Sequence, residues 1–203
     1  MNLPNKLTMF RIFLSLPLIV LLSLFAWYVI VIEKNSFGDV STSTNSQYFL
    51  YASGIIFIIS MITDFFDGYL ARKKQLITEF GKLFDPLADK IITTTTMIFL
   101  AFFNYSYLIC VIVIIIRDLI VDGSRNVAAK NNLKIEASIW GKLKTLIQSI
   151  ALPIIIFLIP VIDEKIWWEL FIINIPLIIA TILSIISGVI YFKEIYPIIK
   201  KDR

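Results

Sequence analysis

Four regularly spaced aspartates are the residues of this sequence best suited to chemistry. Asp64 and Asp67 follow an apolar run, YFLYASGIIFIISMIT, and Asp85 and Asp89 precede another, IITTTTMIFLAFF. A charged side chain at the centre of a membrane span costs about 2.5–3.5 kcal/mol on insertion scales, and less near its end. A single aspartate could be explained as an ion pair or, for Asp85 before a proline, as a helix cap. Four of them on neighbouring apolar segments indicate a functional site.

The spacing places the four carboxylates on two helical faces. Residues three and four apart share one face of an α-helix. The first stripe holds Asp64, Asp67, Gly68 and Ala71, and the second holds Gly81, Asp85 and Asp89. Because the connection between the stripes is short, we expect two antiparallel neighbouring helices that bring the carboxylates into one cavity.

The absence of histidine narrows the chemistry of this cavity. Four carboxylates at close range repel one another unless protons or cations neutralise them. The chain has no histidine, which excludes imidazole as a metal ligand and as a general base. Ligation by oxygen alone favours Mg²⁺, Mn²⁺ or Ca²⁺ over Zn²⁺, and two divalent ions would balance the charge. The small residues on the same stripes either allow close helix packing or leave room for a ligand.

The segments around the aspartates have the composition of a membrane protein. Of the 203 residues, 58% are hydrophobic, compared with about 45–50% in soluble domains. The first apolar run, after Lys6 and Arg11, has no signal-peptide cleavage site and is interpreted as a retained span. The sequence predicts an all-α integral membrane protein, a single-domain bundle over residues 1–203 with six transmembrane helices at about 8–32, 48–74, 80–103, 107–129, 139–161 and 168–192.

Basic residues indicate how such a bundle is oriented. If the helices alternate in direction, one side carries nearly all the Lys and Arg, whereas the other carries only Lys34 and Lys165. The positive-inside rule then places both termini in the cytoplasm. The carboxylates lie toward the same side, so we expect a multi-pass protein of the cell membrane whose active site faces the cytoplasm. No nucleic-acid partner is expected, because the basic residues border membrane spans.

The complete aspartate segment carries a family resemblance. It reads Asp64-x2-Asp67-Gly68-x2-Ala71-Arg72-x8-Gly81-x3-Asp85-x3-Asp89. This pattern resembles the signature of the CDP-alcohol phosphatidyltransferase family at every fixed position, and the predicted helix count agrees with that family. Two further stretches, NLPNKLTMFRI and RDLIVDGSRNVAAKNNLKIEASIWGKLKTLIQ, are similar to its phosphatidylglycerophosphate synthase branch.

The resemblance implies roles for individual residues. Asp64, Asp67 and Asp85 would hold one divalent ion, and Asp64, Asp85 and Asp89 a second, with Mg²⁺ or Mn²⁺ as the metal. Asp89 would also be the general base that takes the proton of the acceptor hydroxyl. The residues implied in binding CDP-diacylglycerol are Asn5, Lys6, Leu7, Thr8, Gly68, Ala71, Arg72, Thr78 and Gly81. The family also suggests a homodimer.

The implied reaction transfers a phosphatidyl group from CDP-diacylglycerol to glycerol 3-phosphate, with release of CMP. An anionic acceptor requires cations, and the candidates are Arg117, Arg125, Lys142 and Lys144. Arginine matches phosphate oxygens in a bidentate way. The alternatives are that the two lysines only mark the membrane boundary and that Arg117 pairs with Asp118.

Three other functions are compatible with parts of the pattern. The acceptor could be another alcohol, such as inositol phosphate, serine or phosphatidylglycerol. A cation transporter would also use intramembrane acids, but it predicts acids spread across the bilayer and cation flux without CMP release. A lipid-binding protein without catalysis would have no need of the intact signature.

Overall fold

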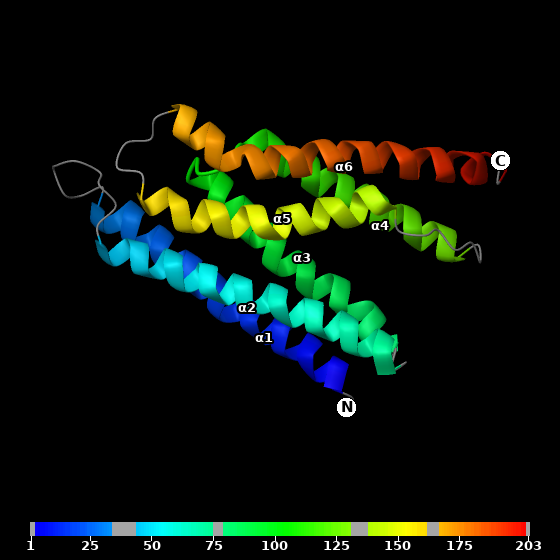
Figure 1. The fold of residues 1–203 in the computed structure, drawn as a ribbon, viewed down its shortest axis with the longest axis horizontal. Helices are drawn as coiled ribbons and strands as arrows, with labels where there is room; N and C mark the ends of the chain where they lie inside the picture. Colours follow the sequence, from blue (N-terminus) through cyan, green and yellow to red (C-terminus); the bar gives the residue numbers. More distant parts are fainter. Residues whose placement is uncertain (1–2, 34–43, 75–78, 131–137, 162–166, 202–203) are drawn as a thin grey trace. The chain divides into compact units, whose positions relative to one another are not determined.

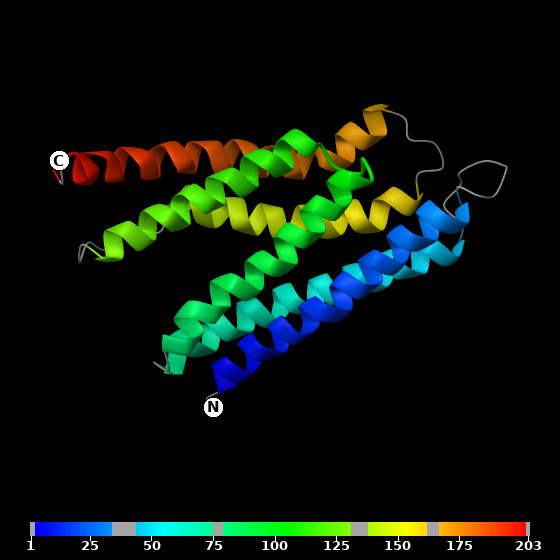
Figure 2. The ribbon, with the colours of Figure 1, turned by 180° about the vertical axis from the view of Figure 1, so that it is seen from behind.

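The computed structural model describes residues 3–33, 44–74, 79–130, 138–161 and 167–201. These ranges form six α-helices (Figures 1 and 2). They are α1 (Leu3–Trp27), α2 (Thr44–Lys74), α3 (Glu79–Phe102), α4 (Leu108–Lys130), α5 (Ile139–Leu158) and α6 (Trp167–Lys201). A π-helical turn, Tyr28–Glu33, continues α1, and a 3₁₀ turn, Ile159–Val161, continues α5.

The six predicted helices are confirmed, with differences at their ends. Helix α1 begins at Leu3 rather than near residue 8, because Pro4 falls in the first turn, where its missing N–H costs nothing. Helix α6 continues to Lys201 rather than ending near residue 192. The residues that follow position 192, such as Lys193 and Glu194, are good helix formers.

Four of the described helical segments are long and apolar enough to cross a membrane. They are Asn5–Val31, Ser46–Phe66, Ile139–Val161 and Trp167–Lys193. Helices α3 and α4 carry more charge, with Asp85, Asp89 and Lys90 in the first and Arg117 and Asp118 in the middle of the second. The apolar helices indicate a multi-pass membrane protein, and spanning by all six helices stays a prediction.

The described helices form two compact units. The first comprises Met1–Phe99 and Pro153–Lys165, and the second Leu100–Leu152 and Ile166–Arg203. In the first, α1 packs along α2. The face of α1 that is buried there changes from polar to apolar along the helix: Thr8, Arg11, Ser15, Leu18, Leu22 and Phe25. Its apolar end continues in an edge-to-face contact between Phe25 and Phe99 of α3, with ring centroids 5.5 Å apart.

In the second unit, α4 packs along α6. The turn before α4 is fixed to α6 by Asn174, whose Nδ2 donates to the carbonyl of Tyr105 at 3.0 Å. Asn104 in that turn has φ 57°, a conformation that asparagine tolerates better than most residues. This anchoring fixes the start of α4.

The long helices carry their polar residues far from their starts. At about 1.5 Å per residue, Asp64 lies about 30 Å along α2 from Thr44. Tyr191 lies about 36 Å along α6 from Trp167. The hydrocarbon core of a bilayer is about 30 Å thick. Asp64 and Tyr191 can therefore lie at the membrane–water interface while the part of each helix before them crosses the lipid.

Gly54 provides a test of packing in the first unit. A Cβ at this position would lie 2.8 Å from Ile156 Cγ2 and 2.9 Å from the ring edge of Phe157. The Phe157 ring is itself stacked on Tyr51 at 5.8 Å. We expect Gly54→Ala to lower the free energy of unfolding by about 1–2 kcal/mol, because overpacking outweighs the gain in helix propensity. Thermal unfolding in detergent, followed by circular dichroism, measures this loss.

Gly123→Ala on α4 is the matched control for Gly54→Ala. Among the described residues, no atom lies within 4 Å of a Cβ built at Gly123. The control should keep or raise the melting temperature, because alanine has the higher helix propensity. Equal melting temperatures for the two variants would contradict the packing described for Gly54.

Candidate active site

The first polar site joins three helices of the first unit around one arginine. Arg11 of α1 donates from Nη1 to Asp64 Oδ1 on α2 and from Nη2 to Asp85 Oδ1 on α3, the latter at 3.3 Å. Thr8, one turn earlier on α1, also donates from Oγ1 to Asp85 Oδ1. The three helices therefore bring one cation, one hydroxyl and two carboxylates together.

Burial differs between the two sides of this cluster. The Arg11 side chain is 1% exposed, whereas those of Asp64 and Asp85 are 48% and 41% exposed. Removing a charge from water is costly unless it is paired, and the two carboxylates provide that pairing for Arg11. Each carboxylate still has an accessible side on which a further ligand can bind.

The remaining residues predicted for this site are only partly described. Asp89 is half-buried on α3, one turn after Asp85, and Gly81 is buried one turn before Asp85. On α1, Asn5 and Thr8 are buried, Leu7 is half-buried and Lys6 is exposed. Gly68 is exposed on α2. Thr78 and the side chains of Asp67, Ala71 and Arg72 lie outside the described part of the chain.

The donor set suits a hard divalent cation. Among the described side chains, no group of three or more His, Cys, Asp or Glu residues is close enough to hold a metal ion. Asp64 and Asp85 nevertheless come from different helices and turn their oxygens toward the same positive guanidinium group. Carboxylate oxygens that converge on a cation, with no nitrogen or sulfur among them, fit a hard divalent ion such as Mg²⁺, Mn²⁺ or Ca²⁺.

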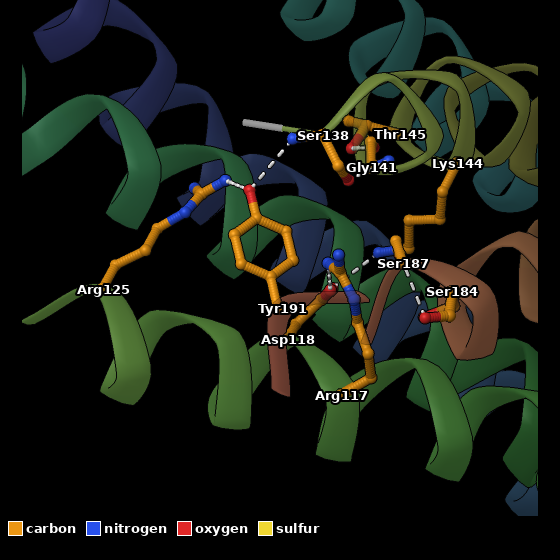
Figure 3. Close-up of polar contacts among 10 residues, drawn as sticks. All are labelled: Arg117, Asp118, Arg125, Ser138, Gly141, Lys144, Thr145, Ser184, Ser187 and Tyr191. Atoms are coloured by element: carbon orange, nitrogen blue, oxygen red, sulfur yellow. Dashed lines mark hydrogen bonds and ion pairs between the residues drawn. The ribbon is translucent and has the colours of Figure 1, made fainter. Parts of the chain in front are cut away.

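The second polar site is a basic cluster in the second unit (Figure 3). Arg117 of α4 donates from Nη1 to its neighbour Asp118 Oδ1 at 3.0 Å. Lys144 of α5 donates from Nζ to Asp118 Oδ2 at 2.7 Å. The pairing of Arg117 with Asp118, considered above as an alternative, is thus present, and the same carboxylate also accepts a hydrogen bond from a lysine of another helix.

Tyr191 of α6 completes the basic cluster. Its hydroxyl accepts hydrogen bonds from Arg125 Nη2 and from the backbone N–H of Ser138, the latter at 3.2 Å. The cluster of Figure 3 therefore holds three cationic side chains, Arg117, Arg125 and Lys144, and one carboxylate. Three positive charges and one negative charge leave a formal charge of +2.

Two glycines make room for Arg117. A Cβ at Gly188 of α6 would lie 3.1 Å from Arg117 Cγ, and one at Gly141 of α5 would lie 3.4 Å from Arg117 Nη2. The Arg117 side chain thus passes close to the bare backbone of two helices. By contrast, Lys142, which was also predicted to bind the acceptor, is exposed, whereas Lys144 is buried.

Sequence reasoning missed Arg11 and Tyr191 as members of these sites. Arg11 was interpreted as a basic flank of the first span, although it lies within a helix that is otherwise largely apolar. A charged residue inside a membrane span indicates a function, so the position of Arg11 in the sequence could have identified it as a site residue. Tyr191 offered no comparable signal, because an aromatic residue near the end of an apolar helix is common.

Comparison with known proteins identifies the family to which nearly the whole of this sequence is similar. The family model described as CDP-alcohol phosphatidyltransferase matches residues 1–190. A Mycoplasma pneumoniae protein named CDP-diacylglycerol–glycerol-3-phosphate 3-phosphatidyltransferase is 38% identical over 207 residues, covering 98% of this chain and 89% of the relative. A Bacillus subtilis protein of the same name is 35% identical, covering 100% and 99%. These alignments extend across the carboxylate site and the basic cluster.

Proposed function

Because this chain belongs to the CDP-alcohol phosphatidyltransferase family, we propose that it transfers the phosphatidyl group of CDP-diacylglycerol to sn-glycerol 3-phosphate. The acceptor hydroxyl oxygen attacks the phosphorus of the phosphatidyl group. The bond from that phosphorus to CMP breaks, and phosphatidylglycerol phosphate forms. Relatives that match nearly the whole chain carry the name of this reaction, and this observation carries the proposal.

In this proposal the carboxylate site catalyses the transfer. Asp64, Asp67, Asp85 and Asp89 would hold two divalent ions, Mg²⁺ or Mn²⁺. When bound, such ions neutralise charge on the attacking and leaving oxygens. Asp89 takes the proton of the acceptor hydroxyl as general base. This role is supported by its half-buried place on α3, one turn after Asp85.

The cytidine diphosphate part lies against the residues around these carboxylates. Thr8, whose hydroxyl bonds Asp85, places the start of α1 beside the acids. The residues proposed to contact the nucleotide are Asn5, Lys6, Leu7, Thr8, Gly68, Ala71, Arg72, Thr78 and Gly81. The acyl chains stay in lipid, because the segment of α2 that precedes Asp64 is apolar.

The basic cluster is proposed to bind the phosphate of the acceptor. Its formal charge of +2 matches a phosphate monoester, which carries about −1.5 to −2 at pH 7. Arg117 and Arg125 offer planar donors suited to phosphate oxygens, and Lys144 adds a point charge. Lys142 is exposed on α5 and adds a further positive charge for the acceptor phosphate.

The membrane arrangement is proposed from the charge pattern. All six helices span the bilayer, both termini lie in the cytoplasm, and the active site faces the cytoplasm, which supplies the soluble acceptor glycerol 3-phosphate. The excess of Lys and Arg on one side of the alternating helices supports this orientation. A homodimer in the cell membrane is proposed by analogy with the family.

Release of CMP tests the proposed function. Purified protein with CDP-diacylglycerol and Mg²⁺ or Mn²⁺ should release CMP with glycerol 3-phosphate. EDTA should abolish the release, and added Mg²⁺ or Mn²⁺ should restore it. Inositol phosphate, serine and phosphatidylglycerol serve as comparison acceptors. Release of CMP with inositol phosphate alone would correct the acceptor, and the absence of CMP with every alcohol would refute the enzyme.

A further inference from the structure

Tyr191 is a buried residue whose hydroxyl has hydrogen-bond partners on two other segments. Its side chain on α6 is 2% exposed. The hydroxyl binds Arg125 of α4 and the backbone N–H of Ser138, the residue before α5. A tyrosine that served only to fill the core could be replaced by phenylalanine, but this one satisfies two donors on other segments.

The Tyr191 ring also contacts two guanidinium groups. The Cζ atom of Arg117 lies 5.6 Å from the ring centroid, and that of Arg125 lies 5.1 Å from it. Figure 3 shows the ring between the two side chains. Cations within about 6 Å of an aromatic centroid are attracted by the ring. One side chain therefore holds two like charges near each other and offsets part of their repulsion.

Gly188 of α6 also helps to fix the position of Arg117. Gly188 lies three residues before Tyr191, on the same face of α6, and a Cβ there would lie 3.1 Å from Arg117 Cγ. The stem of Arg117 thus runs along bare backbone toward the Tyr191 ring, while its Nη1 is held by Asp118 at 3.0 Å. Arg125 has its own hydrogen bond to the Tyr191 hydroxyl.

We propose that Tyr191 is a positioning residue of the acceptor site, which holds Arg117 and Arg125 at a fixed separation so that both bind the acceptor phosphate. This inference rests on the proposed function, which assigns the basic cluster to that phosphate. The hydroxyl fixes Arg125 and the start of α5, whereas the ring lies against both guanidinium groups. Tyr191 itself does not touch the reacting atoms.

Tyr191→Phe separates these contributions, because it removes the hydroxyl and keeps the ring. The KM for glycerol 3-phosphate should rise about tenfold, the scale expected for losing a hydrogen bond to a charged group. The kcat and the KM for CDP-diacylglycerol should stay within about twofold, because the loss falls on binding of one substrate. Tyr191→Leu, which also removes the ring, should raise the same KM further.

Two controls separate positioning from a general structural role. Tyr107→Phe, in the same unit, should leave all three kinetic parameters unchanged. Added glycerol 3-phosphate should raise the melting temperature of the wild-type protein, and the increase should be smaller for Tyr191→Phe. This measurement reports binding of the acceptor independently of turnover. A Tyr191→Phe variant with an unchanged KM for the acceptor, or with kcat and both KM values altered alike, would overturn the proposal.

Failure of the proposed function gives a different result from failure of this inference. If wild-type protein releases CMP only with another phosphorylated alcohol, the assigned acceptor is wrong, and the same KM comparison is made with that alcohol. A selective rise in its KM in Tyr191→Phe would support the positioning role. If wild-type protein uses only uncharged acceptors, or shows no thermal shift with any phosphate ester, the positioning role is refuted as well.

Discussion

Asp89→Asn should reduce turnover by about 10³-fold or more while the protein still binds CDP-diacylglycerol. Asparagine has nearly the same shape as aspartate, but it cannot take a proton from the acceptor hydroxyl. General bases contribute about 10²–10⁴-fold to rates, and loss of a carboxylate ligand would add to the effect. The rate of CMP release at saturating substrates measures turnover, and the shift in melting temperature with CDP-diacylglycerol measures binding.

Glu169→Gln is the control for the Asp89 substitution. Glu169 lies in the first turn of α6, in the second unit, and its change to an amide should leave CMP release unchanged. Turnover of Asp89→Asn within about tenfold of wild type would exclude Asp89 as the base. Loss of both CDP-diacylglycerol binding and turnover would show instead that Asp89 acts mainly in binding CDP-diacylglycerol.

Arg11→Gln should destabilise the metal-free protein and increase its response to divalent ions. Its guanidinium is 1% exposed and binds Asp64 and Asp85, so the variant leaves two neighbouring carboxylates without their counter-ion. Breaking a buried pair costs about 3–5 kcal/mol. Both carboxylates are about half exposed and partly screened by solvent, so we expect a loss of about 1–3 kcal/mol. Thermal unfolding with EDTA measures it.

The metal response distinguishes a counter-ion from a packing residue. Mn²⁺ should raise the melting temperature of Arg11→Gln more than that of wild type, because the ion replaces the missing positive charge. Arg11→Lys should be intermediate, since an ammonium group lacks the planar fork of arginine. Lys193→Gln, at an exposed position of α6, should behave as wild type in both measurements. An equal Mn²⁺ response in Arg11→Gln and wild type would contradict the counter-ion role.

The sequence predicted what depends on local pattern. Apolar runs indicated the six helices, and the spacing of three and four residues placed Asp85 and Asp89 on one face of α3. Helix ends were less predictable at α1 and α6, because charged residues such as Lys193 suit both a membrane boundary and a continuing helix. The family was predicted from the aspartate signature, and the comparisons confirm it.

Contacts between distant segments could not be predicted from the sequence. Arg11 is 53 residues from Asp64 and 74 from Asp85 in the chain. Tyr191 is 53 residues from Ser138 and 66 from Arg125. Periodicity determines which face of a helix a side chain occupies, but not which neighbour that face meets. The pairing of Arg117 with its neighbour Asp118 could be considered as an alternative because it is local, whereas the contact of Lys144 with the same carboxylate could not.

The shared carboxylate of Asp118 has a consequence for how this protein tolerates mutation. It accepts hydrogen bonds from Arg117 on its own helix and from Lys144 on α5. Residues that share a partner show non-additive effects. Losing either cation would leave the other bonded to Asp118, whereas losing Asp118 would remove a hydrogen-bond acceptor from both at once. Substitutions at this cluster should therefore be strongly epistatic, and Asp118 should be replaced only together with Arg117 or Lys144.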